Sequence, residues 1–422
     1  MTKVVILGYG GRGRNYGLLC NNIINKKRFE VVAVIDTQPD KLNLAKKEMN
    51  LADDKLFNNI DDFCAIPKMA KYMFICTQDK QHHEHAIKAL NCGYNLLLEK
   101  PIATTLEDCV DIAKVANEKG LKVDVCHVLR YSGYYEKIKE VIDSGVLGKI
   151  ISIEQVENVA YWHQAHSFVR GDWRNSEESV PMILAKCCHD LDIAVYLADS
   201  KCKYVSSIGK LNYFNKENAP NGATQYCLGG CKAKDKCPYD CEKIYIKDIK
   251  GKPSAVYKYM WPQSRLMTDS TVTIPKLYEA CKNTDFGKCV FLSDNNVVDH
   301  QTVQMEFENG ISSTLTMTAF SGKSSSRETV IRGTLGFMYC HTDKPKFILE
   351  EYGKKPKKIS RSLSARGSHA GGDGKMITAL AEGHAKTDIN MSLESHLMAF
   401  LAEQSRLENG VPKYLDEYRK SY

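Results

Sequence analysis

The chain has 422 residues, of which 43% are hydrophobic and 26% charged, and its formal net charge is +7. This length suits two or three domains, and the ordinary globular composition excludes a disordered or fibrous chain. No apolar stretch approaches the roughly 20 residues that span a bilayer, and we find no N-terminal signal. We therefore expect a cytoplasmic protein that binds no membrane.

The distribution of charge and the positions of the cysteines further limit the partners and the cellular compartment that we expect for this protein. The only dense basic cluster contains Lys354, Lys355, Lys357, Lys358 and Arg361. We interpret it as a solvated loop, so no nucleic-acid partner is expected. Many of the 16 cysteines stand singly inside apolar runs, where reduced thiols behave as small hydrophobes. Most of them are therefore expected to be free thiols in a reducing compartment.

The beginning of the chain predicts a strand, a glycine turn, a helix and a second strand. An apolar run at 4–7 breaks into the letters GYGGRG, and a helix is expected at about 14–25. A second apolar run, 31–35, stops at Asp36. This order is typical of a dinucleotide site, with a glycine-rich turn in another doubly wound domain as the alternative.

Each part of this turn has a physical role in such a site. Gly8 allows the tight turn, Gly10 admits a pyrophosphate close to the backbone, and Gly13 lets the helix pack near the sheet. The free N–H groups and the dipole at the helix start favour the phosphate charge. Asp36 can accept hydrogen bonds from ribose hydroxyls and would repel a 2′-phosphate, so we expect NAD rather than NADP.

Strands and helices alternate up to residue 127. The expected elements are strands at 72–76, 95–98 and 121–126 and helices at 83–91 and 106–118. This alternation implies a parallel sheet with right-handed crossovers, in which ligands bind at the carboxyl ends of the strands. Thr77, His82, Lys100 and His127 lie at such ends, so topology alone makes them site candidates.

From about residue 149 the pattern changes to strands that alternate apolar and polar residues. The expected strands are 149–156, 204–208, 302–307, 312–318, 328–332 and 337–341. They predict a second α/β domain built on a large, mostly antiparallel sheet. A final amphipathic helix is expected at 392–407, packed back on the first domain.

The densest polar stretch of the chain runs from Tyr161 to Arg174. Its rings and charged groups suit a polyhydroxylated ligand such as a sugar, because aromatic faces stack on C–H groups while polar groups bind hydroxyls. The alternative is an ordinary polar loop or a subunit contact. A helix is expected at 181–197, on which Lys186 and His189 share a face.

Four cysteines lie close together in the pattern C-x3-C-x5-C-x3-C: Cys227, Cys231, Cys237 and Cys241. They could hold a structural zinc ion, form disulfides or remain free thiols. The surrounding segment, roughly 214–296, has no continuous strand pattern. We interpret it as an insertion that covers the substrate mouth or a subunit contact.

The chain resembles the Gfo/Idh/MocA oxidoreductases at several motifs. The strand end Glu99-Lys100-Pro101 and the loop Thr77-Gln78-Asp79, followed by His82, match the pattern of that family. His189 followed three residues later by Asp192 matches its acid/base helix. The resemblance covers nearly the whole chain apart from the cysteine-bearing insertion.

The resemblance implies an α/β fold with a doubly wound Rossmann domain at 1–127. It also implies, at 128–422, a domain with a large open sheet for substrate binding and oligomerisation into a homodimer or homotetramer. The implied reaction is hydride transfer between a secondary hydroxyl of a sugar, cyclitol or glycoside and nicotinamide. Lys100 would polarise the reacting oxygen and His189 would act as acid/base. Many members carry an aspartate at the position of Ala185, so the adjacent Lys186 is expected to take over part of its work.

The candidate residues fall into three sets, and two alternative functions remain open. The cofactor-binding set is Gly8, Gly10, Gly11, Arg12, Gly13, Asp36, Thr77, His82, Glu99 and Lys100. The substrate-binding set is Arg130, Trp162, His163, His166, Arg170, Trp173, Lys186 and His189. The catalytic set is Lys100, His189 and Lys186. One alternative is a redox-neutral NAD-dependent glycosidase or lyase that acts through a keto-sugar, and another is a nucleotide-binding regulator without catalysis.

Overall fold

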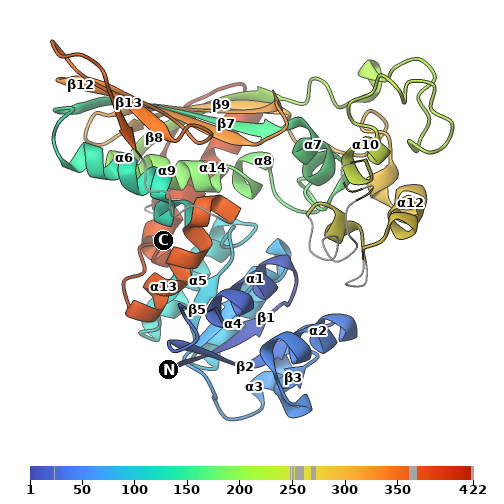
Figure 1. The fold of residues 1–422 in the computed structure, drawn as a ribbon. Coiled ribbons are helices and arrows are strands. Elements are labelled where there is room, and N and C mark those ends of the chain that lie inside the picture. Colours follow the sequence, from blue (N-terminus) through green and yellow to red (C-terminus); the bar gives the residue numbers. More distant parts are fainter. Residues whose placement is uncertain are drawn as a thin grey trace.

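The computed structural model describes residues 1–22, 24–247, 249, 251, 261–267, 272–360 and 368–419, so Arg361 of the basic cluster lies outside the described residues. Two sheets, each with its own helices, lie one above the other in Figure 1. No helix within the described ranges is long and apolar enough to cross a bilayer.

The N-terminal sheet has six parallel strands in the order β3-β2-β1-β4-β5-β6. Its strands are β1 (Thr2–Leu7), β2 (Phe29–Ile35), β3 (Leu56–Phe57), β4 (Tyr72–Ile75), β5 (Asn95–Leu98) and β6 (Val123–Val125). Its helices are α1 (Gly11–Cys20), α2 (Pro39–Met49), α3 (Ile60–Cys64), α4 (His82–Asn91) and α5 (Leu106–Glu118). The expected doubly wound sheet is confirmed. β3 and α3 were not predicted because elements this short show no periodic pattern.

The C-terminal sheet has nine strands in the order β14-β13-β12-β11-β7-β10-β9-β8-β15. Its strands are β7 (Ile150–Ala160), β8 (Cys202–Lys210), β9 (His300–Phe307), β10 (Ser312–Ser321), β11 (Ser326–Gly333), β12 (Gly336–His341), β13 (Lys346–Glu351), β14 (Lys357–Ser360) and β15 (Lys413–Tyr414). Neighbouring strands are antiparallel except β10 and β7, which are parallel. The large, mostly antiparallel sheet is therefore confirmed.

Helices cover one face of the large sheet and leave the other open (Figure 1). α6 (Gly133–Asp143), α9 (Cys188–Ala198) and α14 (Ile389–Leu407) lie along the covered face. Side chains alternate between the two faces along each strand. Ile208 of β8 and Phe320 of β10 remain 63% and 49% exposed, so the open face carries accessible apolar groups.

Two C-terminal segments return to the Rossmann domain. α13 (Gly372–Glu382) buries Ile377 in the apolar core that also holds Val4 of β1. α14, which corresponds to the helix expected at 392–407, buries Ile389 in the core on the other side of the same sheet. Later residues of α14 pack under the large sheet, so this helix joins the two halves of the chain.

The insertion lies between β8 and β9 and forms a separate lobe beside α7 (Tyr161–His163), at the right of Figure 1. Its helices include α10 (Cys241–Tyr245) and α12 (Ile274–Asn283). Its own apolar core contains Phe214 and Leu277. Among the residues described between 214 and 296, none belongs to a strand of either sheet, as the sequence predicted.

Candidate active site at the carboxyl ends of the parallel strands

The glycine turn after β1 has the shape that a dinucleotide needs. Gly8 has a φ of +88°, and a Cβ there would lie 2.7 Å from the Cys76 carbonyl oxygen. A Cβ on Gly13 would lie 2.0 Å from the Gly8 carbonyl oxygen, so α1 packs directly on the turn. At Gly11 a Cβ would meet no heavy atom within 4 Å. The turn and the start of α1 thus form an open cradle that fits a pyrophosphate.

Asp36 follows β2 and faces the same turn. Its carboxylate accepts hydrogen bonds from the backbone N–H groups of Tyr9 at 2.7 Å and Gln38 at 2.9 Å. A carboxylate offers about four lone-pair positions, so these two bonds leave capacity for ribose hydroxyls. Asp36 therefore holds the turn in place and also fits its expected ribose-binding role.

Arg12 and Glu99, both expected near the cofactor, belong to one network. Arg12 Nε donates to Glu99 at 2.6 Å, while Nη2 donates to Asp373 at 2.6 Å and to the Tyr16 hydroxyl. Tyr16 in turn donates to Glu99 at 2.6 Å. Although burial disfavours the charged carboxylate, Arg12 and the Tyr16 hydrogen bond lower the pKa of Glu99. The network fastens α1 to the end of β5 and to α13.

Lys100 follows this network at the carboxyl end of β5. Its Nζ donates to the Ala185 carbonyl at 2.7 Å, so the side chain reaches from the Rossmann domain to the second domain. His82 is fully buried, and its ring nitrogens lie 2.7 Å from the Pro101 carbonyl oxygen and 3.3 Å from that of Thr77. Because both partners are backbone atoms, His82 holds together the two loops that carry Thr77 and Lys100.

Lys186 and His189 come from an interrupted helix. The single helix expected here is wrong: α8 (Met182–Ala185) ends at a turn that includes Lys186, and α9 carries His189. Lys186 and His189 therefore do not lie on one face of a continuous helix. The last carbonyls of a helix lack intrahelical partners, so the break leaves the Ala185 carbonyl free to accept the Lys100 hydrogen bond.

His189 lies in a row of four histidines. Its ring centroid is 5.9 Å from that of His127 and 5.7 Å from that of His369, and His127 is 5.5 Å from His396. Burial lowers the pKa of His189 well below its ordinary range, and the positive charge of Lys100 adds to this effect. Burial likewise lowers the pKa of His127 to about 4 and of His396 to about 3. His189 is therefore neutral at physiological pH, as a proton acceptor must be.

Lys186 belongs to a group of four charges that balance one another. Its Nζ lies 2.7 Å from Glu157, and Arg327 lies 2.8 Å from Glu157 and 2.6 Å from Asp190. Although burial disfavours the charged carboxylate, Arg327 and Lys186 lower the pKa of Glu157. The Lys186 side chain keeps 16% of its surface exposed, so the ion pair orients an ammonium group that solvent or a ligand can still reach.

The aromatic part of the expected sugar site is at α7. Trp162 stacks on His163 with ring centroids 5.8 Å apart, and its indole N–H donates to the Lys323 carbonyl at 2.7 Å. Burial, followed by the positive charges of Lys186 and other cations, lowers the pKa of His163 to about 3. His163 Nδ1 also lies 3.4 Å from the Ser325 hydroxyl, directly before the strand that carries Arg327.

Trp173 and Arg130 make structural contacts around this neighbourhood. The Trp173 indole N–H donates to Asp79 at 2.8 Å, which links the second domain to the loop after β4. Arg130 donates two hydrogen bonds to Asp192, at 2.7 and 2.8 Å, and the pair is buried. Asp192 lies 3.9 Å from the buried His127, so this ion pair is next to the row of histidines.

His166 and Arg170 point into the insertion, which leaves their expected substrate contacts unsupported. The stretch is helical here, because α7 continues into η4 (Gln164–Arg170). His166 Nδ1 lies 3.1 Å from the Tyr245 hydroxyl, and its ring stacks on Phe286 at 5.1 Å. Arg170 is 1% exposed and donates to the Lys288 carbonyl at 2.7 Å.

Sequence analysis missed Glu157 and Arg327, which hold Lys186 in place. They lie on β7 and β11, neighbouring strands far apart in the chain. Glu157 falls in a strand whose alternate residues are buried, so a charge on the buried face is the signal that could have found it.

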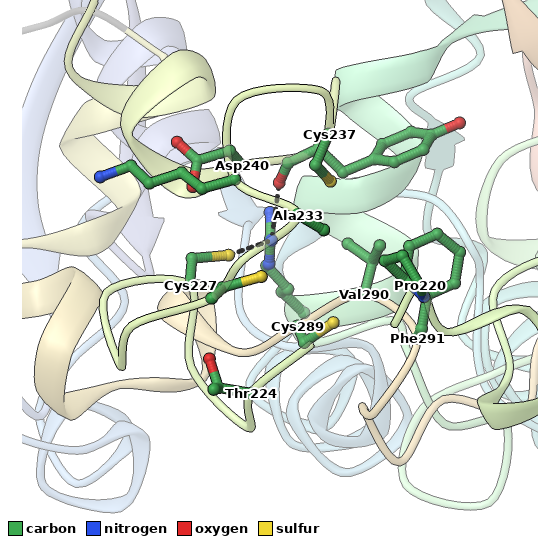
Figure 2. A pocket seen from close by; sticks show the side chains of 13 residues that line it. Pro220, Thr224, Cys227, Ala233, Cys237, Asp240, Cys289, Val290 and Phe291 are labelled. Atoms are coloured by element: carbon green, nitrogen blue, oxygen red, sulfur yellow. Dashed lines mark hydrogen bonds between the residues drawn. The ribbon is translucent and has the colours of Figure 1, made fainter. Parts of the chain in front are cut away.

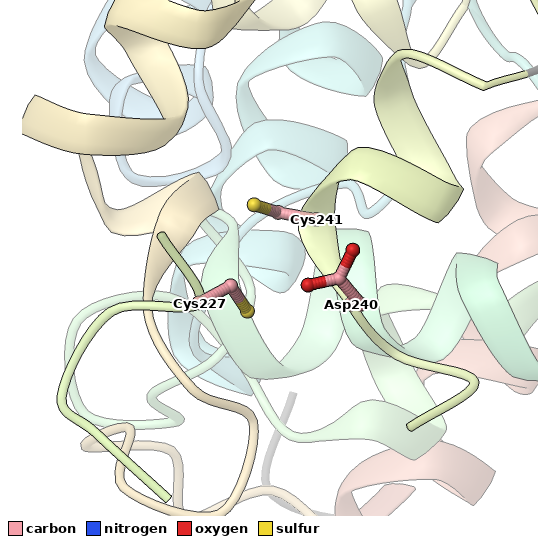
Figure 3. A group of neighbouring side chains, drawn as sticks. All are labelled: Cys227, Asp240 and Cys241. Carbon is pink, nitrogen blue, oxygen red and sulfur yellow. The ribbon is translucent and has the colours of Figure 1, made fainter. Parts of the chain in front are cut away.

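The fold brings only two of the four cysteines in the C-x3-C-x5-C-x3-C pattern into one compact group. All 16 cysteines are free thiols. Figure 3 shows Cys227, Asp240 and Cys241, whose candidate ligand atoms lie within 4.8 Å of one another. Cys231 and Cys237 do not belong to this compact group, so the four cysteines expected from spacing do not form one tight cluster. Cys241 starts α10 and is buried in the apolar core of the insertion, whereas Cys237 lies before this helix and is half-buried.

Two family models match the chain in sequence. The model described as oxidoreductase family, NAD-binding Rossmann fold, matches residues 2–127. The model described as oxidoreductase family, C-terminal alpha/beta domain, matches residues 139–344. Both are models of the Gfo/Idh/MocA family, and together they cover the Rossmann sheet and most of the large sheet.

Individual proteins agree with this match. Oxidoreductase YteT of Bacillus subtilis is 25% identical over 306 residues, which are 68% of this chain and 70% of that protein. The 2,7-anhydro-N-acetylneuraminate hydratase of Escherichia coli is 28% identical over 142 residues, 34% of this chain and 37% of that protein. The solved structure of levoglucosan dehydrogenase with NADH and levoglucosan has the same fold, with a TM-score of 0.69, 13% identity and coverage of 98% of this chain and 99% of that chain. The protein belongs to the Gfo/Idh/MocA family of oxidoreductases, with an NAD-binding Rossmann domain and a C-terminal α/β domain.

Proposed function

We propose that this protein transfers hydride between a secondary hydroxyl of a sugar, cyclitol or glycoside and nicotinamide. The observation that carries the proposal is that Lys100 and His189 converge from the two domains. Lys100 Nζ donates to the Ala185 carbonyl at 2.7 Å, four residues before His189 in the chain, and its positive charge, after burial, lowers the pKa of His189. A fixed cation beside a neutral proton acceptor is the pair of groups that oxidation of an alcohol requires.

The cofactor proposed is NAD rather than NADP. The open space at Gly10 and Gly11 would hold the pyrophosphate at the start of α1, and Asp36 would hold the ribose hydroxyls. A negative carboxylate at that position disfavours a 2′-phosphate. When bound, NAD supplies the hydride acceptor, which no side chain can provide.

The side chains would move the proton and stabilise charge. His189 Nδ1 is buried and has no hydrogen-bond partner among the described residues, so Nε2 would accept the proton of the substrate hydroxyl. Lys100, whose Nζ donates to the Ala185 carbonyl, would donate instead to the reacting oxygen and stabilise its developing negative charge. Lys186, oriented by Glu157, would bind a neighbouring hydroxyl.

A redox-neutral reaction is the second candidate function. The Escherichia coli relative named a hydratase favours it, because that name describes no net oxidation. Such a reaction would use the same lysine and histidine, with the substrate first oxidised and the product later reduced. The cofactor would then return to its starting state in every cycle.

The role of the two side chains is tested with Lys100→Met and His189→Asn. A missing acid/base or charge-stabilising group typically costs about 10²–10⁴-fold in rate, so we expect kcat to fall by this range while NAD affinity is kept. Lys114→Met, on the exposed surface of α5, is the matched control. Wild-type turnover in either active-site variant would contradict the mechanism. A biological effect that survives both substitutions together would instead indicate a regulator.

The two candidate reactions are separated by analysing purified protein for NAD(H) after denaturation in acid. Stoichiometric cofactor that survives purification would favour the redox-neutral reaction, and glycosides would then be screened for cleavage. Cofactor-free protein that binds added NAD reversibly would favour a dehydrogenase, and sugars and cyclitols would be screened for NADH formation. Protein that binds neither NAD nor NADP would contradict both.

We also propose that the chain forms a homodimer or homotetramer through the open face of the large sheet. The helix-free face of the sheet, on which Ile208 is 63% exposed, supports the proposal, because a large uncovered sheet face is available to a second copy of the chain. Sedimentation of the purified chain tests it, and a monomer at all concentrations would contradict it.

A further inference from the structure

Four cysteines of the insertion line one small cavity, and none of the residues proposed for catalysis lines it. The cavity has a volume of about 20 Å³ and is lined by Cys227, Cys231, Cys237 and Cys289, with Arg170 at its wall. Figure 2 shows the three labelled cysteines Cys227, Cys237 and Cys289 around it. A space of this size holds roughly one water molecule, and therefore one metal ion.

Two backbone hydrogen bonds bring the distant members of this set together. Cys227 N–H donates to the Gly287 carbonyl, and Cys289 N–H donates to the Gln225 carbonyl, both at 2.9 Å. They form a short antiparallel bridge in which Tyr226 pairs with Lys288. The two cysteines that follow these paired residues, 62 positions apart in the chain, are thus held at the same cavity.

The other two cysteines come from a single compact turn. The backbone N–H of Lys234 donates to the Cys231 carbonyl at 3.4 Å, and that of Cys237 donates to the Ala233 carbonyl at 3.0 Å. Cys231 and Cys237 are half-buried, whereas Cys227 and Cys289 are buried. The bridge and the turn therefore each contribute two cysteines to the cavity, and a structural zinc ion takes four ligands.

The compact group in Figure 3 is the competing ligand set, and its chemistry fits a metal less well. Asp240 already caps α10, because its carboxylate accepts from the N–H groups of Glu242 at 3.1 Å and Lys243 at 3.3 Å. Cys241 is fully buried in the apolar core of the insertion and does not line the cavity. With Cys227 this set offers three donors, whereas a structural zinc ion takes four.

Arg170 provides an independent argument from charge. It is 1% exposed and forms no ion pair among the described residues, although the Asp240 carboxylate lines the same cavity. Its guanidinium donates to the Lys288 and Tyr239 carbonyls and, at 3.4 Å, to Cys227 Sγ, while Nη1 has no partner within the described ranges. A buried cation needs a negative partner. Zinc bound by four thiolates carries a net negative charge and would provide that partner beside Cys227.

We propose that Cys227, Cys231, Cys237 and Cys289 bind a structural Zn²⁺ ion, with Arg170 donating a hydrogen bond to the Cys227 thiolate. Binding requires the sulfur atoms to close around the cavity to Zn–S distances of about 2.3 Å. The thiols lose their protons on binding, and no redox change occurs. This inference does not depend on the proposed reaction, because the site lies outside the residues proposed to handle substrate.

The ion would also fix part of the expected substrate region. Arg170 is the last residue of η4, and η4 follows directly on His163 and the stacked Trp162. A metal that anchors Arg170 therefore anchors the end of the segment whose beginning faces the active site. We expect removal of the metal to lower the melting temperature of the insertion before it alters the Rossmann domain.

The first experiment measures zinc in the purified full-length protein and in two matched variants. We expect one zinc ion per chain in the wild type, retention in Cys241→Ser, and loss in Cys289→Ser. Retention in Cys289→Ser with loss in Cys241→Ser would overturn the proposal in favour of the compact group. Wild-type protein without zinc after growth and purification with zinc present would also overturn it, with disulfides or free thiols then counted by thiol titration.

The second experiment does not depend on how well a variant folds. X-ray absorption at the zinc edge of the wild-type protein counts the ligands directly. Four sulfur neighbours at about 2.3 Å support the proposal, whereas a shell of mixed sulfur and oxygen overturns it. Cobalt-substituted protein gives the same distinction, because tetrahedral thiolate ligation produces intense visible absorption bands.

Discussion

Replacing Gly10 by alanine should separate cofactor binding from folding. Gly10 has φ −76° and ψ −159°, an extended conformation that alanine adopts without strain. A Cβ there would meet only Lys41 Nζ, at 4.0 Å, so no atom of the folded chain must move. Loss of a favourable helix cap should cost no more than about 1 kcal/mol. The new methyl group would, however, enter the space assigned to the pyrophosphate.

The expected loss of NAD affinity for Gly10→Ala is about 10–100-fold, or about 1.4–2.8 kcal/mol. Gly13→Ala is the opposite case. Its Cβ would lie 2.0 Å from the Gly8 carbonyl oxygen and 3.0 Å from Ile6 Cγ2. An ordinary C···O contact is about 3.3 Å, so α1 would have to move by about 1.3 Å. Such overpacking costs about 1–3 kcal/mol or more of stability, in addition to weaker NAD binding.

The assay combines thermal unfolding of each apoprotein with a fluorescence titration of NAD. Gly11→Ala serves as the third variant, because a Cβ there meets no heavy atom within 4 Å and should leave stability unchanged. The reasoning is refuted if Gly10→Ala binds NAD like the wild type, since the pyrophosphate would then lie elsewhere. Unchanged stability of Gly13→Ala would refute the close packing of α1 on the turn.

Two further predictions concern the buried charges behind the site. Arg130→Met and Asp192→Asn each leave one partner of a buried ion pair unsatisfied. Each substitution should therefore lower the free energy of unfolding, measured by urea titration, by about 3–5 kcal/mol. A loss below about 1 kcal/mol would show that the ion pair is solvated. The pH dependence follows from His127 and His396, because burial lowers their pKa to about 4 and about 3. At a pH between these folded-state pKa values and the unfolded-state pKa of about 6.5, the unfolded chain binds more protons than the folded chain. The free energy of unfolding should therefore fall as the pH falls, by about 2 kcal/mol for each histidine at about pH 5. His127→Phe should reduce this pH dependence, and a slope equal to that of the wild type would contradict the assignment.

Much of the nucleotide site could be predicted because it is local in the chain. The strand, the turn and α1 follow one another within the first 20 residues, and Gly8 and Gly13 are needed by contacts between neighbouring elements. Lys100 could be placed because parallel strands put their carboxyl ends at one edge, so its position after β5 was sufficient. The motifs around Lys100 and His189 also identified the family.

The surroundings of the second-domain residues could not be predicted in the same way. Lys186 is oriented by Glu157 and Arg327, which meet only when β7 and β11 pair. The break between α8 and α9 has no glycine or proline to announce it, and it supplies the Ala185 carbonyl that Lys100 contacts.

The amino-acid sequence by itself determined the fold class, the family, the glycine turn and the place of Lys100 at the end of a strand, because short-range periodicity and local motifs encode them. Only the tertiary structure decided where side chains point. It directed Arg170 into the insertion and placed Cys289, rather than Cys241, beside the other three cysteines at the cavity. The physical reason is that these contacts join distant segments, such as Arg170 and Lys288, which lie 118 positions apart, and their pairing depends on packing of the whole domain.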